Sequence, residues 1–235
     1  MTTAPCSRRP VDRALAVIGL VVASPLLAVA AFVIKASSRG PILFRASRVG
    51  AVGRPFTMFK LRTMHHESTG GPSITGGHDS RVFRAGRPLR RLKIDELPQL
   101  INVARGDMAI IGPRPEDPRI VNKYYTPMMR RTLDVLPGLA SPGSLHYYAN
   151  ERGLPDDPTE AERLYVSQLL PRKLALELVY IENRSVRYDF ELVVRAAAGI
   201  LGIWNIFLSR QRWECEQAGT LLRTELADHP KRIVE

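Results

Sequence analysis

The chain has 235 residues, enough for one domain with a substantial hydrophobic core. Its 34 Lys and Arg residues outnumber its 23 Asp and Glu residues, which gives a formal net charge of +11. Such an excess favours an anionic partner: nucleic acid, an anionic membrane surface or a phosphorylated substrate. The two cysteines, Cys6 and Cys215, lie at opposite ends of the chain and argue against a disulfide framework or a zinc site.

A long apolar segment begins near the N-terminus. Ala14 to Ile34, ALAVIGLVVASPLLAVAAFVI, is 21 residues without a charge. As a helix it would be roughly 31 Å long, enough to cross the hydrocarbon core of a membrane. Arg8, Arg9 and Arg13 precede it, as in a signal peptide, but the run is long for that role. Lys35 also follows where a small-residue cleavage site is expected, so we predict that the segment is retained.

The dipeptide Ser24-Pro25 interrupts the middle of this segment. Proline removes a helical hydrogen bond, and Ser24 can donate to a carbonyl in the preceding turn, so we expect a bend. Basic residues lie on both flanks of the segment. The three arginines named above precede it, and Lys35, Arg39, Arg45 and Arg48 follow it. A straight span would carry one of the two basic clusters across the membrane. The pattern therefore favours a re-entrant helix, and a kinked membrane-spanning helix stays an alternative.

The next segment, residues 41 to 64, predicts two short strands around a turn at Gly50 to Gly53. In the second strand the alternation places Lys60 and Arg62 on one face. That face is either a solvated sheet surface or a clamp for an anion. Farther on, the 13 apolar residues from Ala196 to Leu208 are too few to span a membrane and suit a core or interfacial helix.

Two adjacent carboxylates, Asp95 and Glu96, lie in the basic stretch RLKIDELPQL. Pro98 predicts the first turn of a helix that ends near Gly106, and the residue before proline, Leu97, is expected to be extended. Neighbouring residues do not face one another on a helix or a strand, so the two carboxylates would have separate roles.

A carboxylate among cations stays ionised, as a nucleophile or a magnesium ligand requires. In phosphoryl transfer, cations neutralise the charge that develops, and several basic side chains are candidates for this role: Lys60, Arg62, Arg90, Arg91 and Arg114. The alternative from the residues alone is a solvated helix start in which Arg91 pairs with Asp95.

Three long motifs give the sequence a family resemblance from about Val11 to Gly202. They are RVGAVGRPFTMFKLRTM, ITGGHDSRVFRAGRPLRRLKIDELPQLINVARGDMAIIGPRPE and LELVYIENRSVRYDFEL, and they follow the Ser24-Pro25 helix in order. The chain resembles the bacterial sugar transferases, monotopic polyprenyl-phosphate phosphoglycosyl transferases that begin the assembly of surface glycans and exopolysaccharides. The resemblance implies transfer of a phospho-sugar from a nucleoside diphosphate sugar, expected to be a UDP-sugar, to undecaprenyl phosphate.

The resemblance also implies roles for individual residues. It makes Asp95 the covalent nucleophile and a ligand of Mg²⁺, and Glu96 a base toward the lipid phosphate. It makes Lys60, Arg90 and Arg114 phosphate-binding residues. One departure stands out, because the family pattern Pro-Gly-(Leu/Ile/Val)-Thr-Gly is here Pro137-Gly138-Leu139 followed by Ala-Ser-Pro-Gly at 140–143. The effect of that change on the donor sugar stays open.

We therefore expect an α+β, mainly helical protein with a re-entrant membrane helix, a small β-hairpin and interfacial helices around the active site. The expected parts are a membrane anchor (1–40), a catalytic domain (41–210) and a C-terminal tail (211–235). The protein would lie on the cytoplasmic face of the inner membrane, and a homodimer is left open. A nucleic-acid-binding module is disfavoured because no recognition motif occurs. A non-catalytic scaffold or a weakened paralogue stays an alternative.

Overall fold

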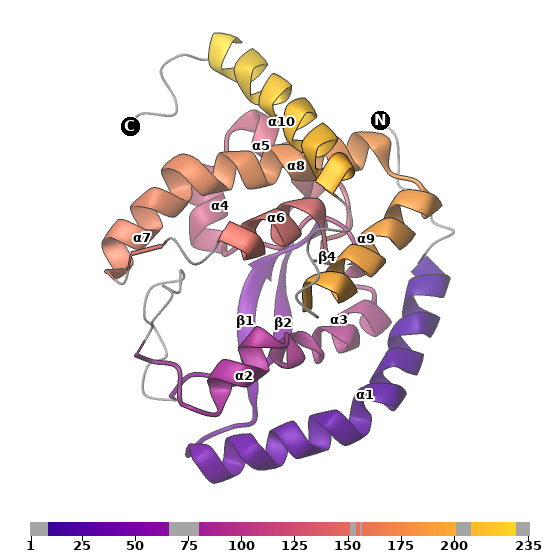
Figure 1. Cartoon of the computed structure of the whole chain (residues 1–235), viewed down its shortest axis with the longest axis vertical. Coiled ribbons are helices and arrows are strands. Elements are labelled where there is room, and N and C mark those ends of the chain that lie inside the picture. The colour runs from indigo at the N-terminus through magenta and orange to yellow at the C-terminus, as the bar shows by residue number, and fades with distance from the viewer. Residues whose placement is uncertain (1–8, 66–79, 151–153, 156, 201–207, 229–235) are drawn as a thin grey trace.

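The structure is a computed structural model of the whole chain, and it describes residues 9–65, 80–150, 154–155, 157–200 and 208–228. Helices dominate these residues, with two small sheets between them, as expected for a mainly helical α+β protein (Figure 1). The first half contains α1 (Arg9–Ser37), β1 (Leu43–Val49), η2 (Ala51–Gly53), β2 (Pro55–Leu61), α2 (Gly86–Arg91), η4 (Ile94–Glu96), α3 (Gln99–Arg105) and β3 (Ala109–Ile111). The second half contains α4 (Pro118–Tyr124), α5 (Pro127–Arg130), η5 (Arg131–Asp134), β4 (Gly138–Ala140), α6 (Pro142–Asn150), α7 (Pro158–Leu164), η7 (Tyr165–Leu169), α8 (Leu170–Asn183), α9 (Val186–Ile200) and α10 (Leu208–Asp228).

Helix α1 has two arms that meet at an angle, and it runs along the edge of the molecule (Figure 1). The helix contains Pro25, whose missing N–H leaves the carbonyl of Val21 without its usual helical donor. The hydroxyl of Ser24 donates to that carbonyl at 2.7 Å. The predicted replacement of the lost hydrogen bond is confirmed, and it gives a physical cause for the bend.

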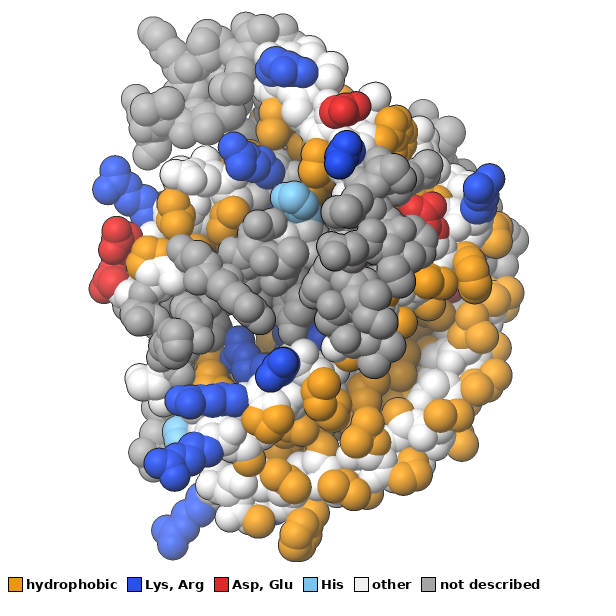
Figure 2. All heavy atoms as spheres, viewed as in Figure 1, with side chains coloured by type: hydrophobic (Ala, Val, Ile, Leu, Met, Phe, Trp, Pro, Cys, Tyr) orange, Lys and Arg blue, Asp and Glu red, His pale blue; other side chains and the backbone are white. Residues whose placement is uncertain are grey.

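Among the described residues, protein covers only one narrow side of α1. The first arm packs through Ala16 against the hairpin and α3, and the second packs through Ala30 and Ile34 against β2 and α2. Large apolar side chains elsewhere on the helix are exposed, including Val22 at 74 % and Phe32 at 75 %. Figure 2 shows this apolar surface along the lower right of the molecule. By length and composition α1 is the one helix among the described residues that could cross a membrane.

The predicted hairpin is confirmed. Strands β1 and β2 pair antiparallel from Leu43 opposite Leu61 to Val49 opposite Pro55, around the short η2 turn. Met58 and Leu61 are buried, so one end and one face of the hairpin belong to the core that α1 covers. The hairpin thereby carries Lys60, which lies between these two buried residues in β2, to the edge of the η4 segment.

A second, parallel pair of strands was not predicted. Ala109 in β3 lies opposite Gly138 in β4, although 28 residues separate them along the chain. The pairing continues past β3, because the N–H of Gly112 donates to the carbonyl of Ala140 at 3.1 Å. A side chain at Gly138 would lie 2.0 Å from the backbone nitrogen of Gly112, so this close approach requires glycine.

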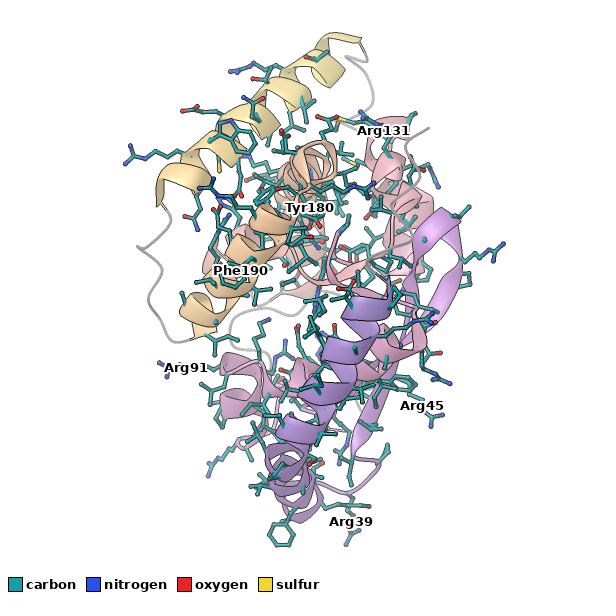
Figure 3. All side chains as sticks on the ribbon, turned by 90° about the vertical axis from the view of Figure 1, so that its right-hand side faces the viewer. Arg39, Arg45, Arg91, Arg131, Tyr180 and Phe190 are labelled. Carbon is teal, nitrogen blue, oxygen red and sulfur yellow. The ribbon has the colours of Figure 1, made fainter. Side chains whose placement is uncertain are left out.

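Helix α8 is the central element of the C-terminal half. Its residues from Leu170 to Tyr180 are almost all buried, between α6 on one side and α10 on another. Figure 3 shows Tyr180 among these helices in the interior, whereas Arg91 and Phe190 lie at the periphery. Helix α8 is followed by α9 after a break at residues 184–185.

The segment after residue 210 is part of this helical layer where the structure describes it. Helix α10 packs on α8, and its buried Glu214 joins it to α9. Arg195 donates two hydrogen bonds to the carboxylate of Glu214, at 2.6 and 2.9 Å, and Tyr188 donates a third at 2.5 Å. Part of the apolar stretch from 196 to 208 lies outside the described residues.

Candidate active site

The two carboxylates of the basic stretch lie on the η4 turn, between α2 and α3. Helix α2 ends at Arg91, and Lys93 then adopts a left-handed backbone conformation with φ +57°. Non-glycine residues rarely adopt this conformation, which is concentrated at functional sites. The left-handed residue interrupts the helix between Arg91 and Asp95. These two residues therefore do not lie on one continuous helix, as the alternative of a solvated helix start required. The helix after the turn ends at Gly106 as predicted, but Leu97 is helical and the expectation that it is extended is wrong.

Glu96 is the centre of a cluster of three cations from three parts of the fold. Its Oε1 atom lies 2.7 Å from Arg114 Nη2, 3.3 Å from Lys93 Nζ and 3.4 Å from Lys60 Nζ. Burial alone would raise the pKa of Glu96, but the charge of Arg114, followed by those of Lys93 and Lys60, holds it well below its usual range. Glu96 is therefore ionised at neutral pH, with three cations around its Oε1 atom.

Asp95 has the opposite environment, although it is the next residue. Its side chain is buried, with the residue 7 % exposed, and its Oδ1 atom has no hydrogen-bond partner among the residues that the structure describes. Burial raises the pKa of Asp95, and the adjacent charge of Glu96 raises it further, while Lys60, Lys93 and Arg90 oppose both effects. The expectation that neighbouring cations alone would keep Asp95 ionised omitted its burial. A buried oxygen without a partner is costly, and a ligand that paired with it would remove that cost.

The structure brings most of the predicted site residues together. Lys60 and Arg114 contact Glu96 directly, and Arg90 acts on the charge of Asp95 from the end of α2. Burial lowers the pKa of Lys60 to about 8, against the opposing charge of Glu96. Lys60 therefore loses its charge at a much lower pH than an exposed lysine does.

Arg62 is the exception, and its predicted role in substrate binding is corrected. Its side chain is buried, and its guanidinium donates to the carbonyls of Ser38, Pro41 and Met64 and to the hydroxyl of Ser38. These hydrogen bonds use all three nitrogens of the guanidinium. Arg62 therefore joins the hairpin to the end of α1 and is not available to a phosphate.

Two residues of the site were missed. Lys93 stands in the quoted basic stretch, and its ammonium group lies 3.3 Å from Oε1 of Glu96, three residues later. Gln99 lies one helical turn after Asp95 and is fully buried, with its Oε1 accepting from Arg114 at 3.3 Å and its Nε2 unpaired. The spacing of Asp95 and Gln99 was the available signal, since residues four apart share a helical face.

The donor set permits a magnesium ion but does not form a complete cage for one. No group of three or more His, Cys, Asp or Glu side chains converges within the described part of the chain. Among the described residues, Oδ1 of Asp95 is a buried carboxylate oxygen of this cluster that has no hydrogen-bond partner. Mg²⁺ commonly binds through one or two carboxylates together with substrate phosphates and water, so Asp95 fits such a site.

Comparison with known proteins identifies the family of the chain. The profile of the family described as "Bacterial sugar transferase" matches residues 3–214, which include the whole cluster. The chain belongs to this family. The family match contains the Asp95–Glu96 turn, the hairpin with Lys60 and the loop with Arg114.

Individual relatives of this sugar transferase carry names that describe one reaction type. A UDP-glucose:undecaprenyl-phosphate glucose-1-phosphate transferase of Caulobacter vibrioides is 38 % identical over 189 residues, covering 78 % of this chain and 66 % of its own length. A UDP-N-acetylgalactosamine-undecaprenyl-phosphate N-acetylgalactosaminephosphotransferase of Aeromonas hydrophila is 34 % identical, covering 83 % of this chain and 43 % of its own length. A glucose-1-phosphate transferase of Xanthomonas campestris is also 34 % identical, covering 81 % and 38 % respectively. The chain therefore spans less than two thirds of the length of these relatives.

Proposed function

We propose that this protein transfers a sugar 1-phosphate from a UDP-sugar to undecaprenyl phosphate through a covalent intermediate on Asp95. The observation that carries the proposal is the contrast within the carboxylate pair. Oε1 of Glu96 contacts three cations, whereas Asp95 has a buried oxygen that no described residue pairs with. Family membership and the names of the relatives supply the substrate classes.

In the first step, the carboxylate of Asp95 attacks the β-phosphorus, which bears the sugar. A bond forms between the Asp95 oxygen and phosphorus, and the bond from phosphorus to the bridging oxygen breaks, so that UMP leaves with that electron pair. Asp95 must be ionised to attack, and an incoming cation would lower its raised pKa. A magnesium ion at Asp95 would supply that positive charge and would neutralise the diphosphate.

In the second step, an oxygen of the lipid phosphate attacks the same phosphorus. The new phosphorus–oxygen bond gives the polyprenyl diphosphate sugar, and the Asp95 carboxylate leaves and is regenerated. Arg114, Lys60 and Lys93 are partly buried and already oriented around Glu96, so they can bind phosphate oxygens with little rearrangement. Glu96 holds these cations in place, and the resemblance also makes it a base toward the lipid phosphate.

We further propose that α1 enters and leaves the membrane on the cytoplasmic side. The bend at Pro25, the replacement hydrogen bond from Ser24 and the exposed apolar side chains support this topology. Helix α2 packs on one arm of α1 and α3 on the other, so the η4 turn between them lies beside the bend. The reacting carboxylate would then lie at the level where a lipid phosphate is found.

The test is UMP release by the purified protein in the presence of undecaprenyl phosphate and each of several UDP-sugars. Wild type should release UMP with at least one sugar, and mass spectrometry after incubation with the donor alone should detect a phospho-sugar on Asp95. Replacing Asp95 with Asn should abolish both signals while the protein stays folded. Robust turnover by Asp95→Asn would exclude the covalent mechanism, and no release with any nucleotide sugar would favour the non-catalytic scaffold.

A further inference from the structure

Arg114 is held in place from several directions. Its guanidinium donates to Glu96, to Gln99 and, from Nη1 at 3.0 Å, to the carbonyl of Leu139. Its backbone N–H donates to Oε1 of Glu177 on α8 at 3.4 Å. Two of these partners, Leu139 and Glu177, lie outside the carboxylate turn, and both are connected to the segment at 139–143, where the sequence departs from the family pattern.

Glu177 and Ser141 connect the backbone of Arg114 to the segment 139–143. Glu177 is fully buried, and the hydroxyl of Ser141, itself fully buried, donates to its Oε1 atom at 2.6 Å. A Cβ atom at Gly143 would lie 2.6 Å from the same oxygen, so the segment fits closely around the carboxyl group. Oε1 of Glu177 therefore accepts hydrogen bonds from two donors in different loops, the Ser141 hydroxyl and the Arg114 backbone N–H.

Burying the carboxyl group of Glu177 costs free energy of folding. No ion pair of Glu177 is found within the described residues, and its Oε2 atom has no hydrogen-bond partner. Burial raises the pKa of Glu177 to about 7, although Ser141, Lys173 and Arg114 oppose the shift. An apolar side chain of similar volume would avoid the cost, so packing alone does not explain the residue.

We propose that Ser141 and Glu177 are positioning residues that fix Arg114 for binding the diphosphate of the donor. The inference rests on the proposed function and extends it to two residues that touch neither Asp95 nor Glu96. Glu177 holds the Arg114 backbone, Ser141 holds Glu177, and Leu139 holds the guanidinium. The segment 139–143 thereby sets the position of the cation that lies closest to Glu96.

The test is a double-mutant cycle on the kinetics of UMP release. In the wild-type background, Ser141→Ala and Glu177→Leu should each lower kcat/KM about tenfold, mainly through KM, because Arg114 is held less firmly. In an Arg114→Lys background, each should have less than a twofold further effect. Glu177→Gln keeps an acceptor for both donors and should stay within about threefold of wild type.

The matched control is Glu182→Gln on the same helix, whose carboxylate forms an exposed ion pair with Arg131 at 3.0 Å. It should leave kcat/KM unchanged. Effects of Ser141→Ala and Glu177→Leu that persist in full in the Arg114→Lys background would overturn the inference, because they would not act through Arg114. Wild-type kinetics in Glu177→Leu would overturn it as well, with thermal unfolding showing that each variant is folded.

Binding of uridine diphosphate, measured by calorimetry, separates this inference from the proposed reaction. If wild type binds the nucleotide but turns over no sugar donor, the proposed reaction fails. A weaker affinity of Ser141→Ala and Glu177→Leu would then still support their role in positioning Arg114. Equal affinity in all variants would overturn that role, and no binding by wild type would overturn both proposals.

Discussion

Neutralising Asp95 and neutralising Glu96 should have opposite effects on stability, although the residues are adjacent. Asp95→Asn removes a charge that is buried beside an unpaired oxygen, so the melting temperature should be unchanged or raised. Glu96→Gln removes the anion on which Arg114, Lys93 and Lys60 converge. Three cations are then left close together without their common partner.

The size of the second effect follows from burial. Removing one partner of a buried ion pair costs about 3–5 kcal/mol. Here the side chains are 13 % exposed for Glu96, 23 % for Lys60 and 32 % for Lys93, and glutamine keeps an acceptor oxygen. Solvent screening therefore reduces the expected cost to about 2–3 kcal/mol. Since about 1 kcal/mol corresponds to roughly 2–4 °C in a domain of this size, Glu96→Gln should melt roughly 4–12 °C lower than wild type.

The measurement is thermal unfolding of both variants and wild type in the same detergent, followed by circular dichroism, beside an assay of UMP release. Asp95→Asn should lose activity without losing stability. Glu96→Gln should lose part of both. Destabilisation of Asp95→Asn by as much as Glu96→Gln would refute the electrostatic contrast. Salt provides a control, because added chloride should reduce the difference between wild type and Glu96→Gln.

Three further predictions concern the cations and the membrane segment. Arg114→Lys should lower kcat/KM at least tenfold despite the retained charge, because lysine cannot form the two-pronged contact with phosphate; unchanged kinetics would exclude that contact. Because the pKa of Lys60 is lowered to about 8, its charge is present below that pH and is lost above it, so kcat/KM should fall as the pH rises through 8. Lys60→Arg should move that fall to higher pH, and an unmoved profile would assign it to another group. Two single-cysteine variants, one with Cys6 (outside the described residues) and one with Cys215, should resist an impermeant maleimide in intact cells. Both should react after the inner membrane is opened. Labelling of Cys6 alone in intact cells would show a straight span.

The parts of the fold that were predictable depend on short-range patterns. The hairpin follows from alternation around a glycine-containing turn, and the end of α3 follows from Gly106, whose φ of +85° suits glycine. The response of α1 to Ser24-Pro25 was also predictable, because the unpaired carbonyl and its replacement donor lie three residues apart. In each case one element determines its own conformation.

The parts that were missed depend on contacts between distant residues. Alternation predicted Lys60 and Arg62 on one face of a strand, but β2 ends at Leu61, and the sequence could not show that the end of α1 would cover Arg62. The parallel pairing of β3 with β4 involves only three residues in each strand, too few for a sequence signal. The contact between Arg114 and Glu177 spans 63 residues and depends on that pairing.

The position of the carboxylate turn beside the bend of α1 affects how the acceptor is found. With α1 in the membrane as we propose, undecaprenyl phosphate reaches Asp95 by diffusing laterally, and its chain does not have to leave the lipid phase. The encounter is then two-dimensional, so the relevant concentration is the mole fraction of acceptor in the bilayer and not its amount per volume of solution. Adding inert lipid at constant total acceptor should therefore slow the second step, while the first step, which takes its donor from water, should be unaffected.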